Sequence, residues 1–141
     1  MMIKEMISTK DMLEVFPLMR QLRTHLSQEA FIRIARDAKD KEGYKIFALH
    51  DEGRIVAAAG IKPSITLYNG YSVWVSDLVT DLESRSQGYG EKLLSYIEAW
   101  AKEHGYSNVT LSSGVQRLDA HRFYEDKMGY LKTSYYYKKE I

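Results

Sequence analysis

The sequence predicts a mixed α/β layer fold, and three observations lead to it. Apolar residues recur with helical and strand periods in the order βαα, three strands, then αβαβ. A strand over residues 71–80, a helix and a strand over 108–113 are joined by short connections, which predicts a right-handed crossover with parallel neighbouring strands. Hydrophobic residues make up 45% and charged residues 28% of the 141 positions, as in soluble globular proteins. One domain spanning residues 1–141 is therefore expected.

The first part of the chain predicts a short strand and two helices. Residues 3–8 alternate between apolar and polar as a strand does, and Ser8 with Asp11 offers N-cap chemistry for a first helix. Pro17 is expected to kink or split that helix, because proline lacks a backbone donor. A second helix is expected over residues 27–39.

The middle of the chain changes to the period of strands. Apolar runs at 46–50 and 55–61 flank a glycine-containing turn and predict a hairpin. Pro63 is expected to interrupt the second of these strands. Asn69-Gly70 then predicts a tight turn into the long strand over 71–80.

The second half predicts two more helices and two more strands. One helix begins near Glu91 and ends at Gly105, where glycine is the expected residue after a helix. The strand over 108–113 follows, then a helix over 118–127 and a tyrosine-rich last strand over 130–138. Pairing of that last strand with a second copy would give a homodimer, which the sequence leaves open.

Charge and composition narrow the range of partners. Twenty basic and nineteen acidic residues give a formal charge of +1, so no overall field attracts nucleic acid or an anionic membrane. The absence of cysteine excludes a disulfide framework and a thiol nucleophile. The four histidines show no short metal-ligand spacing, and no metal is expected. Without a secretory signal or a bilayer-spanning apolar stretch, a cytoplasmic location is the default expectation.

A glycine-containing turn at residues 85–90, Arg-Ser-Gln-Gly-Tyr-Gly, is the candidate ligand site. It lies between the carboxyl end of a strand and the start of a helix, where unpaired N–H groups and the helix dipole favour a phosphate. The turn lacks the lysine and hydroxyl residue of a P-loop and the downstream acid of a dinucleotide site. A local anion site of another kind is therefore predicted.

Two motifs place this turn in a wider pattern. The first joins Leu78-Val79-Thr80 to the turn and to Leu93-Leu94, and the second is Ala-His-Arg-Phe-Tyr-Glu at residues 120–125, followed by Gly129-Tyr130. Together they resemble the GNAT superfamily of acyl-CoA N-acyltransferases. The resemblance implies a three-layer fold with helices on both faces of a mixed, mostly antiparallel sheet, in which the parallel strands 71–80 and 108–113 splay apart.

The resemblance also implies acetyl-CoA as the co-substrate, used without a metal. The backbone of Leu78, Val79 and Thr80 would pair with the pantetheine arm as an additional strand would. The glycine turn and the first helical residue would hold the CoA pyrophosphate through backbone N–H groups. These residues are Arg85, Ser86, Gln87, Gly88, Tyr89, Gly90 and Glu91.

Two side chains are candidates for the chemistry. Tyr124 matches the family's tyrosine near the thioester sulfur, which protonates the departing thiolate as a general acid; packing on the core is the alternative. Asp77 is the first candidate for a base or for an anchor of the substrate amine, weighed equally against a solvated or hydrogen-bonded strand acid. Asp81 and Glu83 are expected to belong to a solvated loop. His121 is expected to be a surface or packing residue.

The implied activity is direct acetyl transfer to the primary amine of a small molecule, peptide or protein. The acceptor stays unidentified, because the scaffold does not determine the acceptor pocket. A CoA-binding sensor without turnover is the alternative, left open by the uncertain base and by Arg117, which stands where many relatives carry asparagine. A nucleic acid-binding module is disfavoured by the near-neutral charge.

Overall fold

The computed structural model describes all residues 1–141 and divides into two compact units, Met1–Thr110 and Leu111–Ile141. The elements are β1 (Met2–Glu5), α1 (Thr9–Leu22), α2 (Gln28–Glu42), β2 (Lys45–Asp51), β3 (Arg54–Thr66), β4 (Gly70–Thr80), the 3₁₀ turn η1 (Leu82–Ser84), α3 (Tyr89–Glu103), β5 (Asn108–Leu111), α4 (Leu118–Arg122) and the π-helical turn η2 (Phe123–Lys127). None of the helices is both long and apolar enough to span a bilayer.

The strands form one sheet in the order β1-β2-β3-β4-β5. β1 through β4 pair as antiparallel neighbours. β5 joins β4 in the parallel sense, since Ser107 N–H donates to Tyr71 O at 2.8 Å and the Thr110 hydroxyl lies 3.5 Å from Val73 O, so the residue numbers rise together. The predicted mixed, mostly antiparallel sheet is confirmed.

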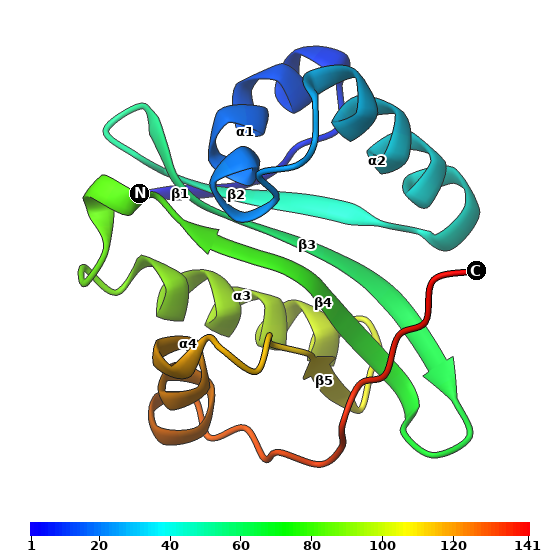
Figure 1. Cartoon of the computed structure of the whole chain (residues 1–141). Coiled ribbons are helices and arrows are strands. Elements are labelled where there is room, and N and C mark those ends of the chain that lie inside the picture. The colour runs from blue at the N-terminus through cyan, green and yellow to red at the C-terminus, as the bar shows by residue number, and fades with distance from the viewer. The chain divides into compact units, whose positions relative to one another are not determined.

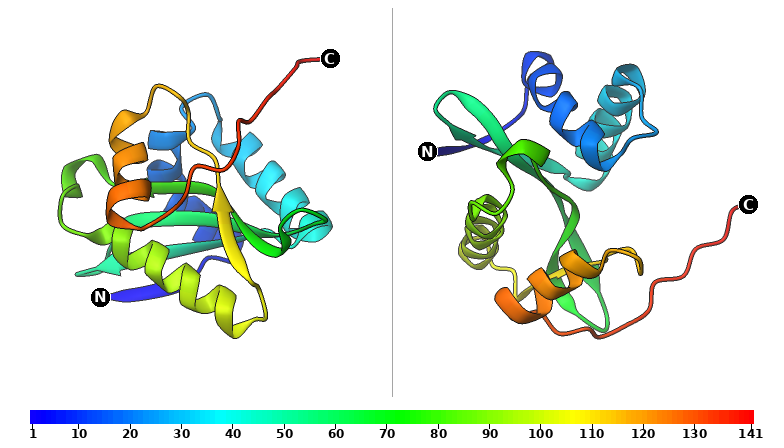
Figure 2. Two further views of the ribbon diagram at one scale, coloured as in Figure 1. Left: turned by 90° about the horizontal axis from the view of Figure 1, so that it is seen from below. Right: turned by 60° about the vertical axis from the view of Figure 1, so that its left-hand side comes forward.

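Helices cover both faces of this sheet (Figure 1). α1 packs on β3 and β4 with α2 beside it, and α3 packs on the opposite face (Figure 2). The core under α1 and α2 includes the fully buried Val15 and Ala58. Under α3 it includes Leu93, Leu94 and Ile97, each 0% exposed. Both apolar layers hold β4 in the middle of the fold.

The two long N-terminal helices begin at serine caps, of which the sequence predicted the one at Ser8. The Ser8 hydroxyl accepts from Asp11 N–H at 3.0 Å, and the Asp11 carboxylate accepts from Ser8 N–H at 3.2 Å, which completes a capping box. Ser27 caps α2 in the same way through Ala30 N–H. Helix α3, in contrast, has no side chain bonded at its N-terminus.

The two prolines interrupt their elements less than the sequence suggested. α1 is not split, because it continues through Pro17 as one helix whose neighbours Phe16 and Leu18 are buried; their packing outweighs the lost backbone bond. A kink at Pro17 stays a prediction. β3 is not interrupted either, since Pro63 pairs with Val73 of β4. β2 begins at Lys45, opposite Ile61, so at Pro63 the strand β3 has a neighbour on one side only, as an edge strand does.

The second unit differs most from the sequence prediction. The helix expected over 118–127 is divided into α4 and the π-helical turn η2. β5 ends at Leu111 instead of residue 113. The last strand predicted over 130–138 was wrong: the segment has no regular structure, and Tyr135, Tyr136 and Tyr137 are 76–88% exposed. β-propensity reflects pairing and burial, and an exposed segment has neither.

Candidate functional site

The first feature of the candidate site is a bulge in β4. Gly60 of β3 pairs with Asp77, whereas the next residue, Ile61, pairs with Val75, so Ser76 has no counterpart in β3. The bulge re-aims the strand at the end where it approaches the glycine turn. Bulges of this kind are frequent beside active sites.

Beyond the bulge, β4 extends past the end of β5. The parallel register that begins at Tyr71 and Ser107 places Leu111 close to the level of Val75. Leu78, Val79 and Thr80 pair with β3 on one side only, through Ala59, Ala58 and Ala57. Their other edge lies beyond the last residue of β5, where an extended ligand could add as a strand does.

The Asp77 side chain is engaged by two donors and is 15% exposed. Arg23, at the C-terminus of α1, donates through Nε to Asp77 Oδ1 at 2.9 Å and through Nη2 to the Ser76 carbonyl at 2.7 Å. The Tyr44 hydroxyl donates to Asp77 Oδ2 at 2.7 Å. Burial raises the pKa of Tyr44 well above its ordinary value, and the Asp77 charge raises it further. Asp77 is thus a hydrogen-bonded strand acid that still reaches solvent.

The glycine turn has the backbone geometry of an anion site. Ser86 and Gly88 both have positive φ, 67° and 79°, and Gly88 is the residue before the first turn of α3. Lys92 N–H donates to Gly88 O at 3.1 Å. Because the first N–H groups of an α-helix have no acceptor within the helix itself, the amides of Tyr89 and Gly90 at the start of α3 can serve a phosphate.

Asp81 and the 3₁₀ turn η1, which precede the glycine turn, are tied to distant parts of the first unit. The Asp81 carboxylate accepts from Gln21 Nε2 at 3.0 Å and from Arg54 Nη1 at 2.9 Å. Gln21 also accepts from Leu82 N–H at 2.9 Å, and Arg54 donates to Ser84 Oγ at 3.2 Å. The Gln21 bond, then the Glu83 backbone N–H and then Arg54, lower the pKa of Asp81, and burial partly offsets them.

Asp81 is therefore not the solvated loop acid that the sequence suggested, because its side chain is only 17% exposed and bonded on both oxygens. The missed partners are 60 and 27 residues away in the chain, and no local pattern marks them. Glu83 is exposed, as expected.

The other residues of the turn divide by exposure. Tyr89 is buried and donates to Asp51 Oδ2 at 2.5 Å, a bond that raises the pKa of Tyr89. Its side chain anchors α3 to the end of β2, which leaves its backbone for a ligand. Arg85 and Gln87 are exposed, while Gly90 and Glu91 are partly buried.

Tyr124 belongs to the second unit, within η2, and is 9% exposed. Phe123 and Tyr130 pack against its ring at centroid distances of 5.3 and 6.1 Å. Burial raises the pKa of Tyr124, and the Arg117 cation partly offsets this effect. The phenol therefore keeps its proton at neutral pH, as a general acid must. In the same unit, His121 Nε2 lies 2.8 Å from the Gly114 carbonyl, an interaction that orients its ring.

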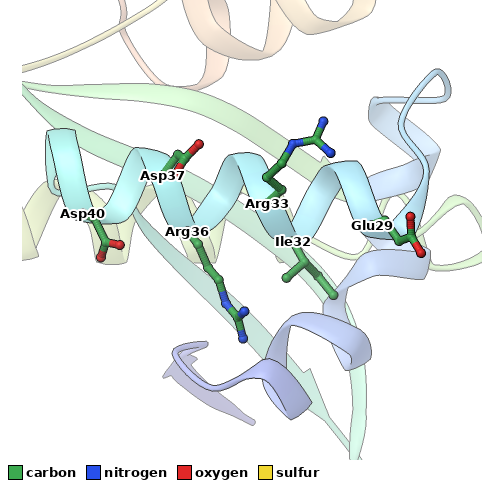
Figure 3. Close-up of a pocket in the computed structure, with 6 residues that line it drawn as sticks. All are labelled: Glu29, Ile32, Arg33, Arg36, Asp37 and Asp40. Atoms are coloured by element: carbon green, nitrogen blue, oxygen red, sulfur yellow. The ribbon is translucent and has the colours of Figure 1, made fainter.

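A separate hollow lies on α2 and contains none of the predicted site residues (Figure 3). It is lined by Glu29, Ile32, Arg33, Arg36, Asp37 and Asp40. A single helix supplies all of these side chains, and the five charged ones point in different directions, so they do not converge on one ligand. No group of three or more histidine, aspartate or glutamate side chains is arranged to hold a metal ion.

Comparison with known proteins identifies relatives along almost the whole chain. Residues 11–130 match the model of the acetyltransferase (GNAT) family, a match that spans both structural units. The chain is 41% identical over 139 residues to the uncharacterized N-acetyltransferase YhdJ of Bacillus subtilis (strain 168), covering 99% of this chain and 98% of that protein.

A more distant relative and a solved structure extend the comparison. The aminoalkylphosphonate N-acetyltransferase of Salmonella typhimurium is 27% identical over 137 residues, which cover 95% of this chain and 88% of that protein. The structure of the aminoglycoside N-acetyltransferase AAC(6')-Iy in complex with CoA superposes with a TM-score of 0.84, covering 99% of this chain and 95% of that chain. At 14% identity, this second likeness establishes the fold alone.

Proposed function

Because the chain belongs to the acetyltransferase (GNAT) family, we propose that it transfers the acetyl group of acetyl-CoA directly to the primary amine of a small molecule, peptide or protein. It is an acetyl-CoA-dependent N-acetyltransferase by family membership. The observation that carries the proposed site is the uncapped N-terminus of α3, with positive φ at Ser86 and Gly88, directly after β4.

In this proposal, residues of β4 and of the glycine turn bind the donor. Leu78, Val79 and Thr80 present a backbone edge to the pantetheine arm, because β5 ends before their level. The backbone N–H groups from Ser86 to Glu91 bind the pyrophosphate, and exposed Arg85 adds a positive charge at the entrance of the turn. The tethers of Asp81 hold this turn in shape before the donor arrives.

The chemical step needs a base and an acid. The amine nitrogen attacks the thioester carbonyl, and a C–N bond forms while the nitrogen loses a proton to Asp77, directly or through water. The C–S bond then breaks, and the Tyr124 hydroxyl gives its proton to the departing thiolate sulfur. Asp77 then releases its proton to solvent and Tyr124 regains one, so both side chains return to their starting states and the net products are the amide and CoA thiol. Burial suits Tyr124 to this role, since its raised pKa keeps the phenol protonated.

The acceptor is proposed at the level of its class, a primary amine. One relative acts, by its name, on an aminoalkylphosphonate, and one structural neighbour, by its name, acts on aminoglycosides. A first panel therefore contains 2-aminoethylphosphonate, an aminoglycoside, a polyamine, amino acids and a lysine-containing peptide. We also infer that both structural units, which the family match spans, act as one acetyltransferase domain.

Two measurements test the proposal. Thiol release from acetyl-CoA is followed over the amine panel, and binding of CoA and acetyl-CoA is measured by calorimetry. Turnover with at least one primary amine is expected. Binding without acetyl transfer to any amine of the panel would favour a CoA sensor, and the absence of CoA binding would refute both functions.

A further inference from the structure

Four residues from four separate parts of the chain meet at the bulge of β4. Arg23 follows α1, Tyr44 precedes β2, Gly60 lies in β3, and Asp77 lies in β4. They all belong to the first unit, and the two hydrogen-bonding partners of Asp77 are 54 and 33 residues away from it in sequence. The fold thus builds a polar cluster around Asp77, although Val79, two residues further along the same strand, is buried in the core.

Gly60 makes this cluster possible. A Cβ atom at Gly60 would overlap the Tyr44 hydroxyl and would lie 2.6 Å from Asp77 Oδ2. The absence of a side chain in β3 therefore provides the space in which the phenol and the carboxylate meet. Gly60 has no positive φ, so its requirement is space and not backbone conformation.

The cluster leaves Asp77 able to serve a ligand. A carboxylate has about four acceptor sites, and Arg23 and Tyr44 occupy two of them. The side chain is 15% exposed, so the remaining lone pairs can accept from an amine or a water. Arg23 also bonds the Ser76 carbonyl, which fixes its guanidinium against the backbone of the bulge.

We propose that Arg23 and Tyr44 are positioning residues that hold the Asp77 carboxylate toward the acceptor amine, with Gly60 providing the space. This inference rests on the proposed function. Two donors fix both carboxylate oxygens, which removes the rotational freedom that the amine would otherwise have to restrict. The nearby guanidinium also disfavours a second positive charge, so it favours the neutral amine that attacks the thioester.

The kinetic test compares single variants with the same changes in an Asp77→Asn background. Tyr44→Phe should lower kcat/KM for the fastest amine of the panel by about tenfold, and Arg23→Gln by about ten- to a hundredfold. Gly60→Ala should resemble Tyr44→Phe. In the Asp77→Asn background, adding Tyr44→Phe or Arg23→Gln should lower kcat/KM by less than about threefold relative to Asp77→Asn alone, because the carboxylate that they position is absent.

Two matched controls remove a phenol and a guanidinium elsewhere. Tyr68→Phe at the exposed β3–β4 turn and Arg33→Gln on exposed α2 should leave kcat/KM unchanged. CoA affinity and the thermal midpoint of each variant report on folding. Arg23→Lys keeps the positive charge but loses the forked geometry, since lysine cannot bond the Asp77 carboxylate and the Ser76 carbonyl as arginine does. Its kcat/KM should therefore be little higher than that of Arg23→Gln. Equal losses with and without Asp77 would overturn the inference, as would full activity of Tyr44→Phe and Arg23→Gln.

An acceptor-free measurement keeps this inference separate from the proposed function. In protein labelled with ¹³C at tyrosine Cζ, the Tyr44 resonance, assigned through Tyr44→Phe, should shift in Asp77→Asn and Arg23→Gln but not in Arg33→Gln. An unshifted resonance in both site variants would refute the cluster itself. A shifted resonance in a protein that acetylates no amine would leave the cluster standing and refute the proposed function.

Discussion

At the scale of single residues, Tyr124 gives the sharpest test of the chemical step. Tyr124→Phe removes the acidic proton but keeps the ring that packs between Phe123 and Tyr130. We expect kcat near pH 7 to fall by about a hundredfold, with little change in KM for acetyl-CoA. Thiol release with the fastest amine of the panel measures both constants.

The pH dependence of this variant has a defined sign. Burial raises the pKa of Tyr124 above its ordinary value of 10.0, so the wild-type phenol stays protonated through neutral and mildly alkaline solution. The deficit of Tyr124→Phe should be largest near neutrality and smallest at high pH, where the wild-type acid begins to ionise. Tyr135→Phe, at a residue 78% exposed, is the matched control. A full rate for Tyr124→Phe would remove Tyr124 from the mechanism.

Residue-level prediction from sequence succeeded where a motif carries the information. The turn at 85–90 was placed correctly between a strand and a helix, because glycine and the change of period mark it locally. Arg23, Tyr44 and Gly60 carry no such mark. Their role depends on contacts between residues that are far apart in the chain, and no sequence pattern indicates that positions 23, 44 and 77 are in contact.

At the scale of elements, the connection between β4 and α3 depends on Asp81. Asp81→Ala removes the bonds to Gln21 and Arg54 and frees the turn that precedes α3. We expect the dissociation constant for CoA to rise by about tenfold, since ordering the turn then costs binding free energy. Calorimetry measures it, with Asp37→Ala on α2 as the control. An unchanged CoA affinity would show that the turn needs no tether.

The same tether predicts how CoA binding responds to acid. The pKa of Asp81 lies below its ordinary value of 3.8, so its contribution is complete above that value and is lost as the pH falls through the lowered pKa. Asp81→Ala should therefore weaken CoA binding by the same factor at pH 6 and at pH 8. A ratio between the variant and the wild type that changes over this range would contradict the assignment.

The capping box of α1 gives a second prediction for an element. Asp11→Ala should lower the free energy of unfolding by about 1 kcal/mol, because the N–H groups of Ile7 and Ser8 lose their acceptor. These two bonds lower the pKa of Asp11 from 3.8 to about 2. The stabilisation is therefore complete above pH 3.8 and lost as the pH falls toward 2.

Urea unfolding of wild type and Asp11→Ala measures this difference. The difference in the free energy of unfolding between the two proteins should be constant from pH 5 to pH 8 and should vanish in strong acid. Glu14→Ala, an exposed acid on the same helix, is the control. A difference that persists unchanged at pH 2 would show that the carboxylate is not its source.

Elements were predictable where their signals are local. The Ser8 cap, the Asn69-Gly70 turn and the glycine after α3 were predicted correctly, since each acts through neighbours in sequence. Pro17 does not split α1, because its neighbours are buried, and Pro63 does not interrupt β3, because β3 has a partner strand on one side only at that position. The last strand was predicted wrongly, because aromatic and β-branched residues form strands only where they pair and are buried. The tyrosines of this segment are exposed.

At the scale of the whole molecule, the family match across both units predicts cooperative unfolding. If Met1–Thr110 and Leu111–Ile141 act as one domain, calorimetry should show a single thermal transition. Saturating CoA at about a hundred times its dissociation constant should add about 2.7 kcal/mol, which raises the midpoint by on the order of 5 to 10 °C. Both units would shift together, although the proposed phosphate site lies entirely in the first. Two transitions, of which CoA moves only one, would refute the single acetyltransferase domain.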